Sequence, residues 1–138
     1  MKHLILKLVV VFAFAFTMVG CVSLSYTERN ELKYLESHGI DVAHARGGYD
    51  APNSVWGAGV LNILPGFGNF YLMFGRGNDP VQGVYGVVNL LLWPISIVWA
   101  APQGAIDAHT LNEREMLYFY HYEKAGKEEM QRSGLQFE

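Results

Sequence analysis

The chain has 138 residues but only one cysteine, Cys21. A single thiol excludes a disulfide within the chain and a cysteine-based metal site. Familiar catalytic motifs are missing too, since no Gly-x-Ser-x-Gly, Walker loop or His-Glu-x-x-His sequence occurs. The net charge of −3 provides no basic excess that would attract nucleic acid. We therefore expect no enzyme, no catalytic residue, no metal and no nucleic-acid partner, and identify no small-molecule substrate.

Residues 1–20 have the layout of a bacterial export signal. A basic start precedes an unbroken apolar run over residues 8–16, and small residues come before Cys21. Residues 18–21, Met-Val-Gly-Cys, resemble the lipobox of bacterial lipoproteins, with Met18 in place of the usual leucine. The resemblance implies cleavage before Cys21 and acylation of its thiol, usually also of its new amine, so a covalent lipid is expected and no other cofactor. An uncleaved membrane anchor is the alternative.

Charged residues are absent from two long stretches, residues 51–75 and 80–106. Each stretch contains an apolar segment of about 20 residues, 55–74 and 81–101, which as a helix would span ~30 Å of hydrocarbon. A backbone in lipid must satisfy its own hydrogen bonds, which favours helices. We therefore predict a mainly α-helical protein, a membrane helical hairpin flanked by short amphipathic helices. The alternative is a buried hairpin in a water-soluble domain.

The same pattern divides the chain into four parts. Residues 1–20 are the signal peptide, 21–53 an N-terminal helix and linker, 54–106 a glycine-rich two-helix membrane hairpin, and 107–138 a C-terminal amphipathic helix and polar tail. Pro65 followed by glycine leaves open whether the first span is kinked or is a re-entrant pair of short helices. Export of Cys21 places both flanks on the periplasmic side, with residues 76–79 near or across the opposite face.

Both flanks carry helix signals. Ser25 and Glu28 have capping-box spacing, and Gly39 is suited to the end of that helix. Thr110 has the same relation to a glutamate three residues later and predicts a second helix ending near Gly126. We expect this helix to pack against the first rather than to lie on lipid, and the polar residues 124–138 to fray.

Small and polar residues within the hairpin are the candidate interface. Small residues let helices approach closely in lipid, and an asparagine there needs a hydrogen-bond partner. The predicted helix–helix interface consists of Gly57, Gly59, Asn62, Gly66, Gly68, Gly83, Gly86 and Asn89. The two asparagines end similar phrases, Gly-Val-Leu-Asn and Gly-Val-Val-Asn, each followed by a proline. Bonds between the asparagines or to a neighbouring copy, and local bonds near each proline, both stay open.

A further resemblance covers residues 55–107. The sequence Leu-Pro-Gly-Phe-Gly-Asn-Phe-Tyr-Leu at residues 64–72, then Gly75 and Arg76, a second apolar span and Asp107, is similar to the bacterial two-transmembrane-helix domain family. The Phe-Tyr-Leu phrase matches that family by position, whereas Gly75 comes later than the family glycine. The resemblance implies a helical hairpin and no reaction.

Two classes of function fit these features. The first is a lipid-anchored envelope protein with a structural or assembly role, which self-associates or clasps another envelope protein through the hairpin. The second is an accessory subunit of a membrane enzyme or transporter, with a site near Asn62, Asn89 and Asp107. The expected partners are the lipid bilayer and either a second copy or another envelope protein. By resemblance to bacterial lipoproteins, Val22 in place of the aspartate that retains them at the inner membrane points to the outer membrane, whereas two apolar helices point to the inner membrane. We expect the periplasmic side of the outer membrane.

Overall fold

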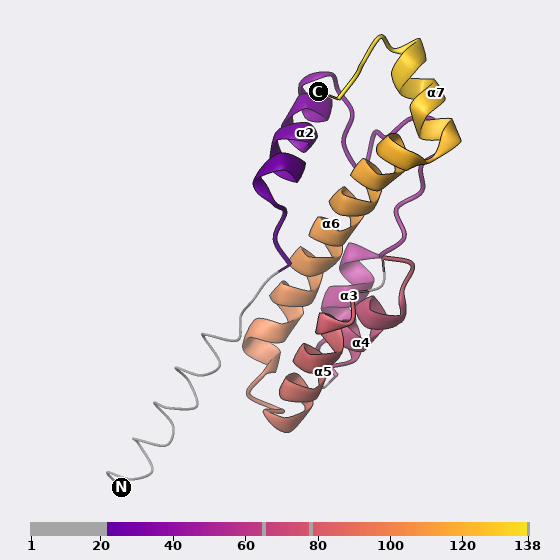
Figure 1. The fold of residues 1–138 in the computed structure, drawn as a ribbon. Coiled ribbons are helices and arrows are strands. Elements are labelled where there is room, and N and C mark those ends of the chain that lie inside the picture. Colours follow the sequence, from indigo (N-terminus) through magenta and orange to yellow (C-terminus); the bar gives the residue numbers. More distant parts are fainter. Residues whose placement is uncertain (1–21, 65, 78, 138) are drawn as a thin grey trace, which may run out of the picture.

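The computed structural model describes residues 22–64, 66–77 and 79–137, and these residues form helices and no strand. Cys21 and the predicted signal peptide lie outside the described residues. The helices are α2 (Tyr26–Ser37), α3 (Val55–Leu61), α4 (Phe67–Phe74), α5 (Val81–Leu91), α6 (Ile97–Tyr122) and α7 (Lys124–Arg132) (Figure 1). The prediction of a mainly α-helical protein is therefore confirmed.

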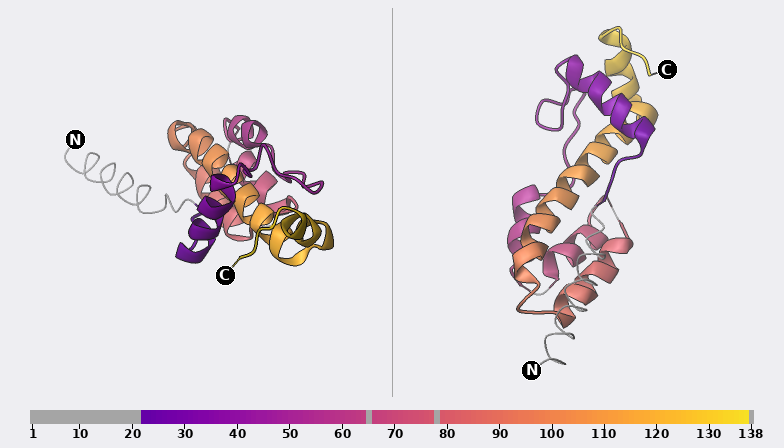
Figure 2. Two further views of the ribbon diagram at one scale, coloured as in Figure 1. Left: turned by 90° about the horizontal axis from the view of Figure 1, so that it is seen from above. Right: turned by 90° about the vertical axis from the view of Figure 1, so that its left-hand side faces the viewer.

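Helix α6 is the longest helix, and a different group of helices lies beside each of its two halves (Figures 1 and 2). Helices α3 and α4 pack against its first half and α5 packs on α4, and we call residues 54–108 the lower lobe. Helices α2 and α7 pack on its second half, and residues 23–53 and 109–137 form the upper lobe. A small apolar cluster of Ala58, Leu72, Ala108 and Leu111 lies where the lobes meet, with Val22 packed against it.

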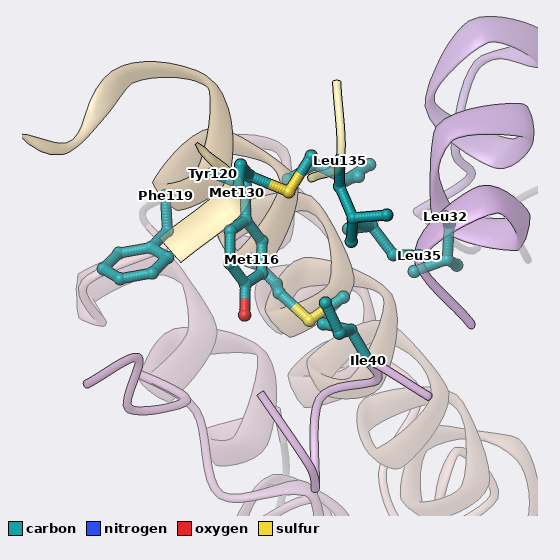
Figure 3. Close-up of a cluster of buried hydrophobic side chains, with 9 residues drawn as sticks. Leu32, Leu35, Ile40, Met116, Phe119, Tyr120, Met130 and Leu135 are labelled. Atoms are coloured by element: carbon teal, nitrogen blue, oxygen red, sulfur yellow. The ribbon is translucent and has the colours of Figure 1, made fainter. Parts of the chain in front are cut away.

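The upper lobe has an apolar core of the kind found in water-soluble proteins. Its buried side chains come from α2, the loop after it, α6, α7 and the C-terminal segment: Leu32, Leu35, Ile40, Met116, Leu117, Phe119, Tyr120, Met130 and Leu135 (Figure 3). The predicted capping box at the start of α2 is present, since Glu28 N–H donates to Ser25 Oγ and Ser25 N–H donates to Glu28. Gly39 follows the last turn with φ of +74°, a conformation suited to glycine.

The C-terminal third differs from the prediction in two ways. Thr110 does not begin a helix, because it lies inside α6, which runs without interruption past residues 106 and 107. Gly126 does not end a helix either, and residues 124–132 form α7 instead of fraying. Burial of Met130 and Leu135 in the upper-lobe core holds α7 in place, and the stabilisation by such packing outweighs a polar composition.

The two predicted long helices are each interrupted, so the prediction of continuous helices over residues 55–74 and 81–101 is wrong. The first stretch forms α3 and α4, separated by a turn in which Gly66 has φ of +75°. The second forms α5, which ends at Leu91, and the beginning of α6 at Ile97. The first stretch is a pair of short helices, the element pattern that the re-entrant alternative required. Within the described part of the chain, no helix has both the length and the apolar character needed to cross a membrane.

The turn between α4 and α5 also lies elsewhere than expected. We predicted residues 76–79 at the opposite face of a bilayer from both flanks. Instead, Gly75 and Gly77 lie against the Asn53 side chain, with added Cβ atoms 2.8 Å and 3.1 Å from its amide atoms. Asn53 is fixed to the middle of α6, since its N–H donates to Asn112 Oδ1 over 2.9 Å and its carbonyl accepts from Asn112 Nδ2 over 2.8 Å. This turn therefore faces the upper lobe.

Candidate functional site

The lower lobe has an apolar surface. Among the described residues, sixteen of the nineteen large apolar or aromatic side chains that are exposed lie between residues 55 and 106. The other three, Tyr26, Tyr118 and Tyr122, are tyrosines of the upper lobe. The sixteen are Val55, Trp56, Val60, Ile63, Leu64, Phe67, Phe74, Val81, Val84, Val87, Leu90, Leu91, Trp93, Ile95, Val98 and Ile106. An exposed apolar surface of this extent marks a site of interaction with a protein or a membrane.

The interior of the same lobe is polar. Its buried polar side chains are Asn62, Asn69, Gln82, Asn89, Ser96, Gln103 and Asp107. Water-soluble proteins place apolar side chains inside and bury polar groups only where they are hydrogen-bonded. Apart from Leu72 and three alanines, the lower lobe therefore buries polar side chains and exposes apolar ones, and its candidate site is this buried network together with the surface around it.

Asn69 of α4 is the centre of the network. Its Nδ2 donates to Gln82 Oε1 over 2.7 Å, and its Oδ1 accepts from Asn89 Nδ2 over 2.9 Å. Its main-chain N–H donates to Asn62 Oδ1 over 3.1 Å. Asn89 in turn accepts from Trp99 Nε1 of α6 over 3.0 Å. The Asn69 side chain thus links α4 to α5, and through Asn89 to α6, while its main-chain N–H links α4 to the end of α3.

Asp107 ends the network on the side of the upper lobe. Its Oδ2 accepts from Gln82 Nε2 over 3.0 Å, and its Oδ1 accepts from the main-chain N–H of Val22 over 2.8 Å. Burial raises the pKa of Asp107, against the lowering effect of these donated hydrogen bonds. Gln103 lies one turn earlier on α6, and its side chain also lowers the pKa of Asp107, although its buried Nε2 lacks a hydrogen bond of good geometry among the described residues. The residue directly after Cys21 is therefore bonded to the interior of the lower lobe.

The asparagines predicted as interface residues do not bond each other directly. Asn62 and Asn89 are both bonded to Asn69, and Asn62 Nδ2 also donates to the Ala100 carbonyl of α6 over 2.8 Å. The two similar phrases occupy equivalent places, because residues 59–62 end α3 and residues 86–89 lie near the end of α5. Each phrase brings an amide to the interior just before its helix turns back.

Three of the predicted glycines lie at the contact between α4 and α5. A Cβ at Gly66 would collide with the backbone of Gly86, and one at Gly86 would lie 2.8 Å from Phe70 Cε1. A Cβ at Gly83 would lie 2.6 Å from the Met73 sulfur. Close backbone approach is the role of small residues between packed helices. Here these contacts are made within one chain.

The remaining predicted glycines are on α3 and α4. Gly59 faces α6, where an added Cβ would lie 3.3 Å from Ala105 Cβ, and a Cβ at Gly68 would collide with the Ala58 carbonyl of α3. Gly57 meets only Ser54 within 4 Å, the residue that caps its own helix, so it lies at no contact between helices. The close-packed glycines contact neighbouring helices of the same chain, so these surfaces are not free to contact a second copy.

Sequence reasoning missed several members of the network. Asn69, Gln82, Ser96 and Gln103 were not singled out, nor was Gly104, whose added Cβ would collide with Asn62 Nδ2. A detectable pattern was the row of Gln82, Gly86 and Asn89 on α5, because residues four and three apart share one helix face. A polar and small row in an otherwise apolar helix indicates a polar interior.

The network supplies amide donors and acceptors and one carboxylate, a set suited to holding helices together where the surrounding medium does not force apolar surfaces inward. Within the described residues, no three histidine, cysteine, aspartate or glutamate side chains are grouped so that they would hold a metal ion. The resemblances to bacterial lipoproteins and to the two-transmembrane-helix family stay predictions, because the chain matches no protein-family model, no curated protein and no solved structure.

Proposed function

We propose that the protein is a lipid-anchored envelope protein with a structural, assembly role. In this proposal the mature chain begins at an acylated Cys21, the lower lobe lies against lipid, and the upper lobe is displayed to a second copy or another envelope protein. The protein performs no reaction of its own. The observation that carries the proposal is the hydrogen bond from Val22 N–H to the buried Asp107 carboxylate, 2.8 Å long.

This bond matters because of where it is. Val22 is the first residue after the predicted lipid attachment, and Asp107 belongs to the lower lobe, whose surface is apolar. Val22, one residue after the predicted attachment point, is thereby fixed to the lobe that carries this surface. Two or more acyl chains hold a protein stably on a bilayer, at roughly 0.8 kcal/mol per buried CH₂. Anchor and apolar surface then act on the same membrane.

The assembly role rests on the upper lobe. Tyr118 and Tyr122 of α6 are exposed, and their ring centroids are 4.8 Å apart. Tyrosine is enriched at protein–protein interfaces because it combines a large apolar ring with a polar hydroxyl. With the close-packed glycines occupied within the chain, this aromatic pair is the contact surface that we propose for another envelope protein or a second copy.

The location that we propose is the periplasmic side of the outer membrane. By resemblance to bacterial lipoproteins, aspartate after the cysteine retains a protein at the inner membrane, and this chain has Val22 there. Density-gradient fractionation tests the location. Cofractionation with outer-membrane markers is expected, and cofractionation with inner-membrane markers would contradict it.

The anchor is tested by intact mass after extraction in mild detergent. We expect loss of residues 1–20 and the added mass of acyl chains, and Cys21→Ser should block both changes. A full-length, unmodified mass in wild-type cells would refute the anchor. The assembly role is tested on the same extract by oligomeric mass and co-purification, with Tyr118→Ser/Tyr122→Ser as the variant. Loss of the oligomer or of a specific partner is expected; one stoichiometric enzyme or transporter would instead establish an accessory subunit.

A further inference from the structure

The lower lobe consists of two helical hairpins that point the same way. Helix α3 runs away from the upper lobe and α4 returns, then α5 runs away and the first half of α6 returns. The contacts between neighbouring helices show this order: Asn62 is bonded to the start of α6 at Ala100, while Asn53 is bonded to its middle at Asn112. Among the described residues, the turn between α5 and α6 lies at the end farthest from α7 (Figure 1).

The ends of these hairpins differ in polarity. The end near the upper lobe carries Arg76 and Asp79, the only charged residues between residues 51 and 106. The far end carries exposed Leu91, Trp93 and Ile95, all large and apolar. A lobe that is apolar at its tip and around its sides, and charged only at its base, has the profile of a segment inserted tip-first into hydrocarbon.

The polar interior of the lower lobe also fits a hydrocarbon environment. In water, the hydrophobic effect would favour the apolar side chains inside, since it is the dominant driving force for folding. In lipid that force between helices is missing, and packing of small residues and interhelical hydrogen bonds holds them together. Asn69, with bonds to three neighbouring residues, and Gly66 against Gly86 are contacts of these two kinds.

The length of the lobe fits one leaflet. Helix α5 has 11 residues, which correspond to ~16 Å at 1.5 Å per residue. The part of α6 from Ile97 to Asp107 has nearly the same length. The hydrocarbon of a whole bilayer is ~30 Å thick, so one leaflet contributes about 15 Å. The lobe is as deep as a leaflet and about half as deep as the bilayer.

Lipid fits this surface better than a second protein copy does. Exposed apolar side chains occur on all four helices, for example Val60 on α3, Phe67 on α4, Val84 on α5 and Val98 on α6. A second copy would cover one face and leave the others in water, whereas acyl chains surround the lobe. An open groove of about 620 Å³ between α4 and α5, lined by Met73 and other apolar residues, suits flexible chains that fill uneven surfaces.

We infer that the lower lobe inserts into a single leaflet of a lipid bilayer as two re-entrant hairpins, with the upper lobe and the α4–α5 turn on the same side. This inference rests on the proposed function for the lipid anchor at Cys21, one residue before Val22. It adds that the lobe itself is surrounded by acyl chains and does not reach the other face.

The test uses the mature, acylated protein in sealed vesicles of phosphatidylethanolamine and phosphatidylglycerol, at fewer than one copy per vesicle so that a second copy cannot cover the surface. Single cysteines replace Leu91 at the tip, Arg76 in the α4–α5 turn and Gln131 in α7. Tyr122→Cys is the matched control, because Tyr122 is 66% exposed and Leu91 77% exposed in the folded chain. A membrane-impermeant maleimide is added outside the vesicles.

Maleimide reacts with the thiolate, which hydrocarbon disfavours. Leu91→Cys should therefore react more slowly than Tyr122→Cys by roughly tenfold or more, the change expected for each unit of raised thiol pKa. Arg76→Cys and Gln131→Cys should both react from outside. Equal rates for Leu91→Cys and Tyr122→Cys would overturn the inference. Reaction of Arg76→Cys only after the vesicles are opened, with Gln131→Cys reacting before, would also overturn it in favour of a spanning hairpin.

Failure of the proposed function is recognised separately. The intact mass of the same preparation reports acylation at Cys21, whereas the relative labelling rates report insertion of the lobe. An unacylated protein with a protected Leu91→Cys refutes the anchor and supports insertion. An acylated protein with an unprotected Leu91→Cys does the reverse.

Discussion

Replacement of Asn69 by leucine probes the network at its centre. The two side chains are similar in size, so the change removes polarity with little change in volume. It breaks the hydrogen bonds of 2.7 Å to Gln82 and 2.9 Å from Asn89, and leaves a buried acceptor and a buried donor without partners. The bond from the Asn69 main chain to Asn62 is not removed.

Known magnitudes set the expected cost of this change. Each buried polar group left without a partner costs about 1–3 kcal/mol. Transfer of the leucine side chain out of solvent returns up to about 2 kcal/mol. The stabilisation measured for a single interhelical hydrogen bond in lipid-like surroundings is smaller, about 0.6 kcal/mol. With two such groups at the middle of their range and the full return for leucine, we expect Asn69→Leu to lower the free energy of unfolding by about 2 kcal/mol.

The assay is reversible urea unfolding of the mature protein in mild detergent, followed by far-ultraviolet circular dichroism. Asn30→Leu is the control, because Asn30 is exposed on α2 and the same substitution there should change stability by less than about 0.5 kcal/mol. Adding Asn89→Leu to Asn69→Leu removes one of the orphaned groups, so the double variant should lose less than the sum of the single variants by about 1 kcal/mol. Equal stability of Asn69→Leu and Asn30→Leu, or strict additivity, would refute the reasoning.

Three further predictions use the same unfolding assay. Gly66→Ala should destabilise by about 2–5 kcal/mol, since it adds a collision with backbone to an unfavourable positive φ; Gly134→Ala, at φ of +66° with nothing within 4 Å, should cost only about 1–2 kcal/mol, and equal losses would contradict the proposed close packing. Burial raises the pKa of Asp107, so folding takes up a proton and the free energy of unfolding should fall as pH rises from the ordinary aspartate value through the raised one. Asp107→Asn should abolish this fall in stability with pH, and a variant that keeps the wild-type pH profile would contradict its assignment to Asp107. Tyr120→Phe should cost about 1–2 kcal/mol, because the hydroxyl accepts from the Arg46 N–H over 2.8 Å and donates to the Arg46 carbonyl; no loss would show that this loop contact is dispensable.

The parts of the fold that were predictable depend on local chemistry. Ser25 and Glu28 satisfy each other's main-chain groups, so their spacing alone locates the start of α2. Gly39 ends the same helix because its positive φ is accessible to glycine at little cost. Two apolar stretches without charge correctly indicated helices in the middle of the chain.

The parts that were missed depend on contacts distant in sequence. Helix α6 continues through Thr110, where the local pattern predicted a new start, because Ala108 and Leu111 pack against α3 and α4 on either side of Thr110. Helix α7 is polar in sequence, yet Met130 reaches the upper-lobe core. Rules based on residues close together in the sequence do not predict these contacts.

The candidate site was only half predictable for a similar reason. Glycine and asparagine in an apolar stretch pointed correctly to close packing and to hydrogen bonds between helices. The assumption of long continuous helices then assigned those residues to a contact between spans or copies. Once the stretch is divided at Gly66, Asn69 comes to lie between Asn62 and Asn89, and the interface becomes the interior of one lobe.

The most direct test of the account is the depth of the lower lobe in a bilayer, measured with nitroxide probes on single cysteines. Val98→Cys lies at the tip and Phe74→Cys near the base. The native side chains are 81% and 79% exposed, so the two probes should be equally accessible if the lobe lies in water. The ratio of the collision rates of each nitroxide with oxygen and with a water-soluble nickel complex reports its depth. This ratio should be largest at Val98, smaller at Phe74 and smallest at Gln131, the reference in water. Equal access of the nickel complex to all three probes would contradict the account.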